Sequence, residues 1–188
     1  MEFFFSVIIP TYNQANLLEK AIASVMNQSF TNFEIIIIDN HSKDSTQKVV
    51  ENFKSNNLIY KKIYNNGVIA KSRNEGIKIS KGEWVAFLDS DDTWHHRRLE
   101  IIANFLKENN NYEAVSTNEL IVDIIINKKK IWRYGPYTKN FYKNLLKNGN
   151  CVPTSATAVS RNFLIKNNIL FNENQNFITA EDYDFFIN

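Results

Sequence analysis

The stretch Trp84-Val85-Ala86-Phe87-Leu88-Asp89-Ser90-Asp91-Asp92 joins an uninterrupted apolar run to a turn that carries three carboxylates. A short apolar run of this kind is typical of a strand that is buried on both faces of a parallel sheet. Ligands of such sheets bind beyond the carboxyl ends of the strands, which is where this turn follows. The stretch therefore predicts an α/β fold with an acidic ligand site at one edge of the sheet.

Strand and helix patterns alternate on the amino-terminal side of this stretch. Apolar, β-rich runs predict strands, and apolar residues at helical spacing predict helices. The expected strands are at residues 4–9, 34–38 and 58–64, and the expected helices are at 15–26, 45–53 and 69–79. Asn13 or Asn16 is the expected N-cap of the first helix. This alternation predicts a Rossmann-like, mostly parallel central sheet flanked by helices.

The carboxyl-terminal half is less regular. Its expected strands are at residues 113–117, 120–126 and 130–134, with a turn at Asn127-Lys128. Its expected helices are at 98–106 and 140–146, and a further helix begins near residue 183. We expect a single domain over residues 1–188, in which 1–95 is the ordered, strand-rich half.

Composition excludes several classes of function. With 22 basic and 20 acidic residues, the net charge is +2, which gives no electrostatic footprint for nucleic acid. The clusters Lys128-Lys129-Lys130 and Arg97-Arg98 are short enough to be solvated turns. The lone Cys151 forms no intrachain disulfide, which fits a reducing cytoplasm. We expect no targeting or transmembrane segment, because the apolar start of the chain is too short to span a bilayer.

The acidic turn after residue 88 has two interpretations. Asp89 and Asp91 are the kind of oxygen ligands that Mg²⁺ or Mn²⁺ takes, one or two at a time, with phosphate oxygens and water completing the shell. Alternatively, the carboxylates cap the helix expected at 98–106, since aspartate is a common N-cap. The turn alone does not choose between them.

Several motifs follow one another in a specific order along the chain. They are Val7-Ile8-Ile9-Pro10-Thr11-Tyr12-Asn13, Ile38-Asp39-Asn40, Asn66-Gly67, Arg73-Asn74-Glu75-Gly76, Lys81-Gly82-Glu83-Trp84, Leu88-Asp89-Ser90-Asp91-Asp92 and Glu181-Asp182. Together they resemble the family 2 glycosyltransferases, strongly through residue 95 and more weakly beyond it. The resemblance implies a GT-A fold, with residues 1–95 as the nucleotide-sugar-binding half and 96–188 as the acceptor-binding half.

The resemblance also implies roles for individual residues. The nucleotide-sugar contacts fall on Pro10, Thr11, Tyr12, Asn13, Asp39, Asn66, Arg73, Asp89 and Ser90. Asp89 and Asp91 match the DxD pair, on the ribose and on a Mn²⁺ or Mg²⁺ ion that bridges the diphosphate. Glu181 and Asp182 are the candidate catalytic pair, from which the family pattern selects Asp182 as the base.

Each of these positions also has a structural interpretation. Tyr12 can be a packing tyrosine, Asp39 a turn former and Arg73 a surface helix residue. Negative charge at Glu181 and Asp182 is favoured at the first turn of any helix.

The activity implied by the resemblance is transfer of one sugar, with inversion, from a nucleoside diphosphate donor, expected to be UDP-linked. The acceptor is a hydroxyl of a glycan or lipid-linked precursor of surface polysaccharide or lipopolysaccharide. The implied location is cytoplasmic, peripheral at the inner face of the membrane, with a homodimer left open. Only six residues follow Asp182, so we expect a chain truncated at its C-terminus. The alternative function is a nucleotide-sugar-binding module without turnover.

Overall fold

The computed structural model describes residues 4–123, 126, 128–135 and 140–187. The strands are β1 (Phe5–Thr11), β2 (Phe33–Asp39), β3 (Leu58–Lys62), β4 (Trp84–Phe87), β5 (Ala114–Ser116), β6 (Glu119–Asp123), β7 (Lys128–Trp132) and β8 (Thr157–Ser160). The helices are α1 (Ala15–Met26), α2 (Thr46–Asn52), α3 (Ile69–Ile79), α4 (Arg98–Glu108), α5 (Phe141–Asn148), α6 (Arg161–Lys166) and α7 (Glu181–Ile187). Two 3₁₀ turns, η1 (Thr154–Ala156) and η2 (Gln175–Phe177), complete these elements.

The main sheet has the strand order β3-β2-β1-β4-β8-β5. Strands β1 to β4 are mutually parallel, whereas β8 runs antiparallel to both β4 and β5. The chain changes direction of winding at β1, which has β2 on one side and β4 on the other. The prediction of a mostly parallel α/β sheet is therefore confirmed, and its switch point lies at the end of β1.

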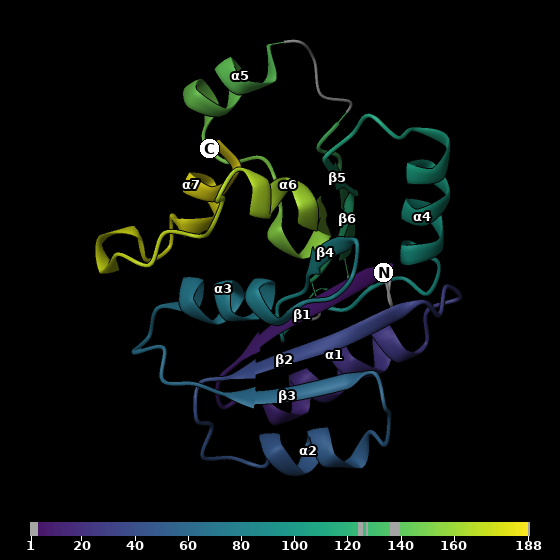
Figure 1. Ribbon diagram of the computed structural model, residues 1–188, viewed down its shortest axis with the longest axis vertical. Coiled ribbons are helices and arrows are strands. Elements are labelled where there is room, and N and C mark those ends of the chain that lie inside the picture. Colours follow the sequence, from purple (N-terminus) through teal and green to yellow (C-terminus); the bar gives the residue numbers. More distant parts are fainter. Residues whose placement is uncertain (1–3, 124–125, 127, 136–139, 188) are drawn as a thin grey trace.

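The central strands β1 and β2 are buried on both faces, and helices cover the two faces of the sheet to give three layers (Figure 1). On one face, Val7 and Ile9 of β1 pack with α1, α2 and α4. On the other face, Ile8 of β1 packs with α3, α6 and α7. Because successive side chains of a strand point to opposite faces, an uninterrupted apolar run is what such a doubly covered strand requires.

The structure corrects several boundaries. Gln14, rather than Asn13 or Asn16, precedes α1, and it makes no side-chain cap. Asp44, in the loop before α2, caps α1 instead, since its Oδ2 accepts a hydrogen bond from Ala15 N at 2.9 Å. β7 begins at Lys128, two residues before the expected strand. Asn127 and the end of the strand expected at 120–126 include positions outside the described residues.

β8 and α6 were not predicted from the sequence. β8 is a short strand of small and hydroxylated residues, with no long apolar run to mark it. It is nevertheless buried over Thr157, Ala158 and Val159, because β4 and β5 pair with it on either side. Tertiary pairing decided its conformation where local pattern was weak.

Candidate functional site

A cleft of about 400 Å³ lies at the carboxyl ends of β1 and β4. Six predicted site residues line it: Pro10, Thr11, Tyr12, Asp89, Ser90 and Asp91. The Thr11 hydroxyl is buried, and within the described part of the chain it has no hydrogen-bond partner. Tyr12 is 51% exposed, so its ring is open to a ligand and is not a packing residue of the core. An open aromatic ring beside polar cleft residues is suited to a polar ligand that carries a flat ring.

Arg73 ties together two acidic residues from distant parts of the chain. Its Nη2 donates to Asp89 Oδ1 at 2.9 Å, and its Nη1 donates to Glu181 Oε1 at 3.1 Å. The guanidinium also lies 5.2 Å from the ring centre of Phe171. At 4% exposure, Arg73 is a buried residue of α3, and its interpretation as a surface helix arginine is wrong.

Asp39 ends β2, beside Thr11 at the end of β1, and it is completely buried. Its Oδ1 accepts from the backbone N and the hydroxyl of Ser42, and its Oδ2 accepts from the Tyr60 hydroxyl at 2.6 Å. Burial raises the pKa of Tyr60, and the hydrogen bond to Asp39 and its charge raise it further. Asp39 thus shapes the loop beside the cleft, and its contact with a base stays a prediction.

The two predicted asparagines occupy turns. Asn13 and Asn66 have positive φ angles of 52° and 55°, which asparagine tolerates better than most residues. Asn13 accepts from Lys43 N at 2.7 Å, which joins the loops after β1 and β2. Asn65 and Gly67 line the cleft on either side of Asn66. The Asn-Gly signal marks this turn, but it does not show which of the two asparagines contributes a side chain.

The acidic turn does not cap α4. The N-cap of α4 is Arg97, which makes no side-chain cap hydrogen bond, so the capping interpretation is wrong. Asp89 N donates instead to Ser155 Oγ at 3.0 Å, which fixes the turn on η1. Desolvation raises the pKa of Asp92, and the charges of Asp91 and Asp89 add to it, while a hydrogen bond from Ser155 opposes them.

The donor set fits a metal that is held jointly with a ligand. In the described ranges, no three His, Cys, Asp or Glu side chains gather into a metal cluster. Asp89 and Asp91 nevertheless both line the cleft. Two carboxylates suffice for Mg²⁺ or Mn²⁺ when phosphate oxygens and water supply the rest of the shell.

Glu181 and Asp182 open α7 and point to different partners. Glu181 is 8% exposed and faces Arg73, whereas Asp182 Oδ2 accepts from Asn150 Nδ2 at 2.9 Å. Through Arg73, the first turn of α7 is connected to the carboxylate turn after β4.

Residues 6–170 match the family described as Glycosyl transferase family 2. The chain belongs to glycosyl transferase family 2. Over 109 residues it is 45% identical to the poly(ribitol-phosphate) beta-N-acetylglucosaminyltransferase TarP of Staphylococcus aureus, covering 56% of this chain and 33% of TarP. Over 135 residues it is 32% identical to WfgD of Escherichia coli, a UDP-Glc:alpha-D-GlcNAc-diphosphoundecaprenol beta-1,3-glucosyltransferase, covering 68% of this chain and 53% of WfgD.

The fold of this family 2 chain also matches a solved structure. The crystal structure of S. aureus TarS 1-349 in complex with UDP superposes with a TM-score of 0.77 and 26% identity, covering 97% of this chain and 54% of the TarS 1-349 chain. The chain therefore spans a third to about half the length of these relatives. The likeness to TarS confirms the predicted GT-A fold.

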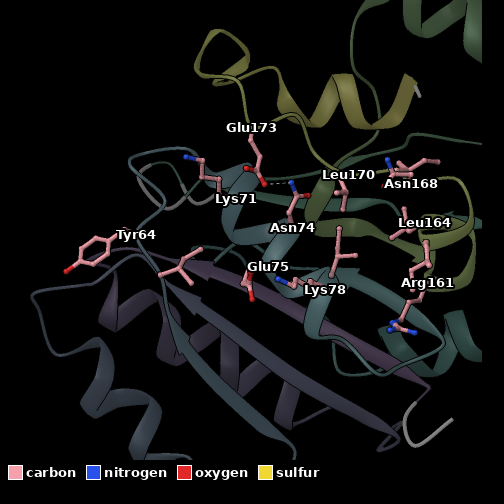
Figure 2. Close-up of a pocket in the computed structure, with 14 residues that line it drawn as sticks. Tyr64, Lys71, Asn74, Glu75, Lys78, Arg161, Leu164, Asn168, Leu170 and Glu173 are labelled. Atoms are coloured by element: carbon pink, nitrogen blue, oxygen red, sulfur yellow. Dashed lines mark hydrogen bonds between the residues drawn. The ribbon is translucent and has the colours of Figure 1, made fainter.

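A larger cavity, of about 670 Å³, lies elsewhere on this family 2 chain, between α3 and α6 (Figure 2). Lys71 and Lys78 of α3 and Arg161 of α6 contribute to its walls, and Asn74 donates to Glu173 across one end at 2.9 Å. Its lining includes neither the carboxylate turn nor Asp182. The larger of the two cavities is therefore not the one that contains the predicted site residues.

Sequence reasoning missed four polar residues of the smaller cleft. They are Gln14, Asn40, Asn65 and Ser72. Asn65 is buried and donates to Ser72 Oγ at 2.8 Å, and its backbone N donates to Asn40 Oδ1 at 2.9 Å. Asn40 and Asn65 are loop residues, and no periodic pattern of apolar residues marks them. Each is nevertheless next to a residue that the resemblance had selected, Asp39 and Asn66 respectively.

Proposed function

We propose that this chain binds a UDP-sugar in the cleft of about 400 Å³ and transfers the sugar, with inversion, to a hydroxyl of a cell-surface glycan precursor. One observation carries the proposal: Tyr12, whose ring is open to a ligand, lines the same cleft as Asp89 and Asp91. A uracil, a ribose and a metal-bound diphosphate are the chemistry that such a lining fits.

The names of the relatives support the choice of substrates. TarS was solved with UDP, and WfgD is named for a UDP-glucose donor and a diphosphoundecaprenol-linked acceptor. TarP is named for a poly(ribitol-phosphate) acceptor. We extend these classes to this chain as a UDP-linked donor and a lipid-linked or polymeric acceptor, used at the inner face of the membrane. In the residues that the structure describes, no helix is both long and apolar enough to cross a bilayer.

We assign the following roles to the residues of the site. Asp91 and Asp89 would hold Mn²⁺ or Mg²⁺, which supplies positive charge to the departing diphosphate. Arg73 holds Asp89 in place and balances its charge. Asp182, half-buried at the start of α7, would remove the proton of the acceptor hydroxyl from the side opposite the diphosphate, so that no covalent intermediate is needed.

The test is calorimetric titration of the chain with UDP, with and without Mn²⁺. We expect EDTA or Asp91→Asn to weaken UDP binding at least tenfold, about 1.4 kcal/mol, while Glu108→Gln at the exposed end of α4 leaves it unchanged. Equal affinity with and without metal, together with an unaffected Asp91→Asn variant, would refute the assigned metal role. Release of UDP from one member of a panel of nucleotide sugars would then separate an enzyme from a binding module without turnover.

A further inference from the structure

The strands β6 and β7 form a two-stranded sheet of their own, apart from the main sheet. Leu120 pairs with Ile131, and Val122 lies two residues along β6, so these three side chains share one face. They are 56%, 58% and 45% exposed in that order. Three aliphatic side chains exposed together on one face of a small ribbon make this face a candidate contact site.

The hairpin also carries an excess of basic residues. Lys128, Lys129, Lys130 and Arg133 are set against two acids, Glu119 and Asp123, which leaves a net charge of +2, equal to that of the whole chain. Both acids accept hydrogen bonds within the hairpin region, from the Tyr134 hydroxyl at 2.6 Å and from Ile126 N at 3.1 Å. By the strand register, Lys129 lies opposite Val122 on the apolar face, whereas Lys128 and Lys130 lie on the other face. The two acids do not fully neutralise the basic charge of the hairpin.

The root of the hairpin adjoins the carboxylate turn. Thr117 N, just before β6, donates to Ala156 O of η1 at 3.0 Å. The neighbouring Ser155 of η1 accepts from Asp89 N at 3.0 Å. The hairpin and the proposed metal ligands are thus anchored on the same 3₁₀ turn. A surface that held the hairpin would lie beside the cleft.

We propose that the β6–β7 hairpin docks the protein on an anionic lipid surface, with Leu120, Val122 and Ile131 against the lipid. Aliphatic groups on the same face as Lys129, in a hairpin with net positive charge, fit the boundary between acyl chains and negatively charged headgroups. Each lysine or arginine near such a surface adds enough attraction to raise the affinity about fivefold. A protein partner would need its own acidic and apolar patch, whereas an anionic bilayer presents both over any area. This docking goes beyond the proposed function, because it needs neither nucleotide nor metal.

Vesicle flotation of the chain, without nucleotide, tests the proposal. At 0.1 M salt we expect the protein to float with vesicles of phosphatidylcholine and phosphatidylglycerol at 7:3, and to stay behind with phosphatidylcholine alone. The double variant Lys129→Glu, Lys130→Glu should lower partition at least tenfold. The matched variant Lys20→Glu, Lys48→Glu changes the net charge equally, at exposed positions of α1 and α2, and should keep most of it.

A second pair of variants tests the face. Ile131 and Ile121 are both exposed on the hairpin, but they lie on opposite faces. We expect Ile131→Asp to lower partition at least fivefold more than Ile121→Asp does. Equal effects of the two variants, or a parent that ignores anionic vesicles, would overturn the proposal. Self-association of the parent that Ile131→Asp abolishes would also overturn it, because the face would then belong to a second copy.

Discussion

The Arg73 guanidinium lies 2.9 Å from Asp89 and 3.1 Å from Glu181, and so links the end of β4 to the start of α7. Arg73 is 4% exposed by side chain, and Glu181 is 11% exposed. Removal of the cation leaves a buried carboxylate without compensation, which is far more destabilising than loss of a solvated pair.

We therefore expect Arg73→Met to reduce the free energy of unfolding by about 3 kcal/mol or more. The control is Arg97→Met, which breaks the Arg97–Glu100 bridge, whose arginine is 56% exposed. That change should amount to less than about 1 kcal/mol. Urea unfolding followed by circular dichroism measures both. Similar losses for the two variants would show that the Arg73 network does not stabilise the fold.

Gly82 packs against the backbone of β1. A Cβ atom at this position would lie 2.6 Å from Ser6 N and 2.7 Å from the carbonyl carbon of Phe5. Gly82 N also donates to Ser6 Oγ at 2.8 Å, and Ser6 is buried in the sheet. Because backbone in a central strand cannot give way as a side chain does, Gly82→Ala must displace β4 from β1.

We expect Gly82→Ala to destabilise the protein by about 2 kcal/mol or more, within the range for overpacking. Gly149→Ala is the comparison, because Gly149 has a φ of 81° but open space around its Cβ position. That variant should lose about 1–3 kcal/mol from backbone strain alone, because a φ of 81° with a ψ of −172° is a conformation that only glycine adopts readily. Thermal unfolding measures both losses, and a Gly82→Ala variant as stable as the parent would contradict the packing argument.

The local pattern of apolar residues predicted those strands and helices whose conformation follows from their own sequence. The apolar runs of β1, β2 and β4 needed no partner to be recognised, because only a doubly covered strand buries every residue. β8 could not be predicted in this way, since its small residues are strand-forming only between β4 and β5. The cleft residues differ in the same way. Thr11 and Asp89 lie at the ends of apolar strands and were predicted, whereas the loop residue Asn65 was not.

Contacts between distant residues were the least predictable part. Arg73 and Glu181 are 108 positions apart, and no periodicity links them. The resemblance to a family selected both residues, but it did not show that one binds the other. Their pairing depends on the placement of α7, whose Phe185 stacks on Phe171 with ring centres 4.0 Å apart. Phe171 is in turn held to α3, because its backbone N donates to Asn74 Oδ1 at 2.9 Å.

The Tyr60–Asp39 hydrogen bond predicts a dependence of stability on alkaline pH. Burial and the neighbouring Asp39 raise the pKa of Tyr60 above its ordinary value of 10.0. A folded-state pKa above the unfolded value gives stability that is complete below about pH 10 and is lost as the pH rises further. The loss from one group is at most about 1.4 kcal/mol per pH unit.

Tyr60→Phe should therefore be less stable than the parent at pH 8, and the difference should shrink or reverse between pH 10 and 11.5. Urea midpoints across this range measure the difference. Tyr112→Phe, at a position that is 49% exposed, is the control and should follow the parent throughout. A Tyr60→Phe variant that stays equally far below the parent at every pH would be incompatible with the raised pKa.

Asp182 and Glu181 are adjacent, but the structure gives them different surroundings, and this separation makes the proposed base testable. Glu181 Oε1 accepts from Arg73, so Glu181→Gln should lower stability along with any activity. Asp182 is hydrogen-bonded to Asn150 and lies outside that buried network.

Asp182→Asn keeps the shape of the side chain and one acceptor oxygen, and it removes only the basicity. We expect it to slow release of UDP from the donor sugar roughly 10²–10⁴-fold, with calorimetric UDP affinity and the urea midpoint nearly unchanged. Asp184→Asn, on the same helix, is the matched control and should keep turnover and UDP affinity close to those of the parent. Turnover of Asp182→Asn within tenfold of the parent would remove Asp182 from the role of base, and a slowed Asp184→Asn would assign that role to Asp184.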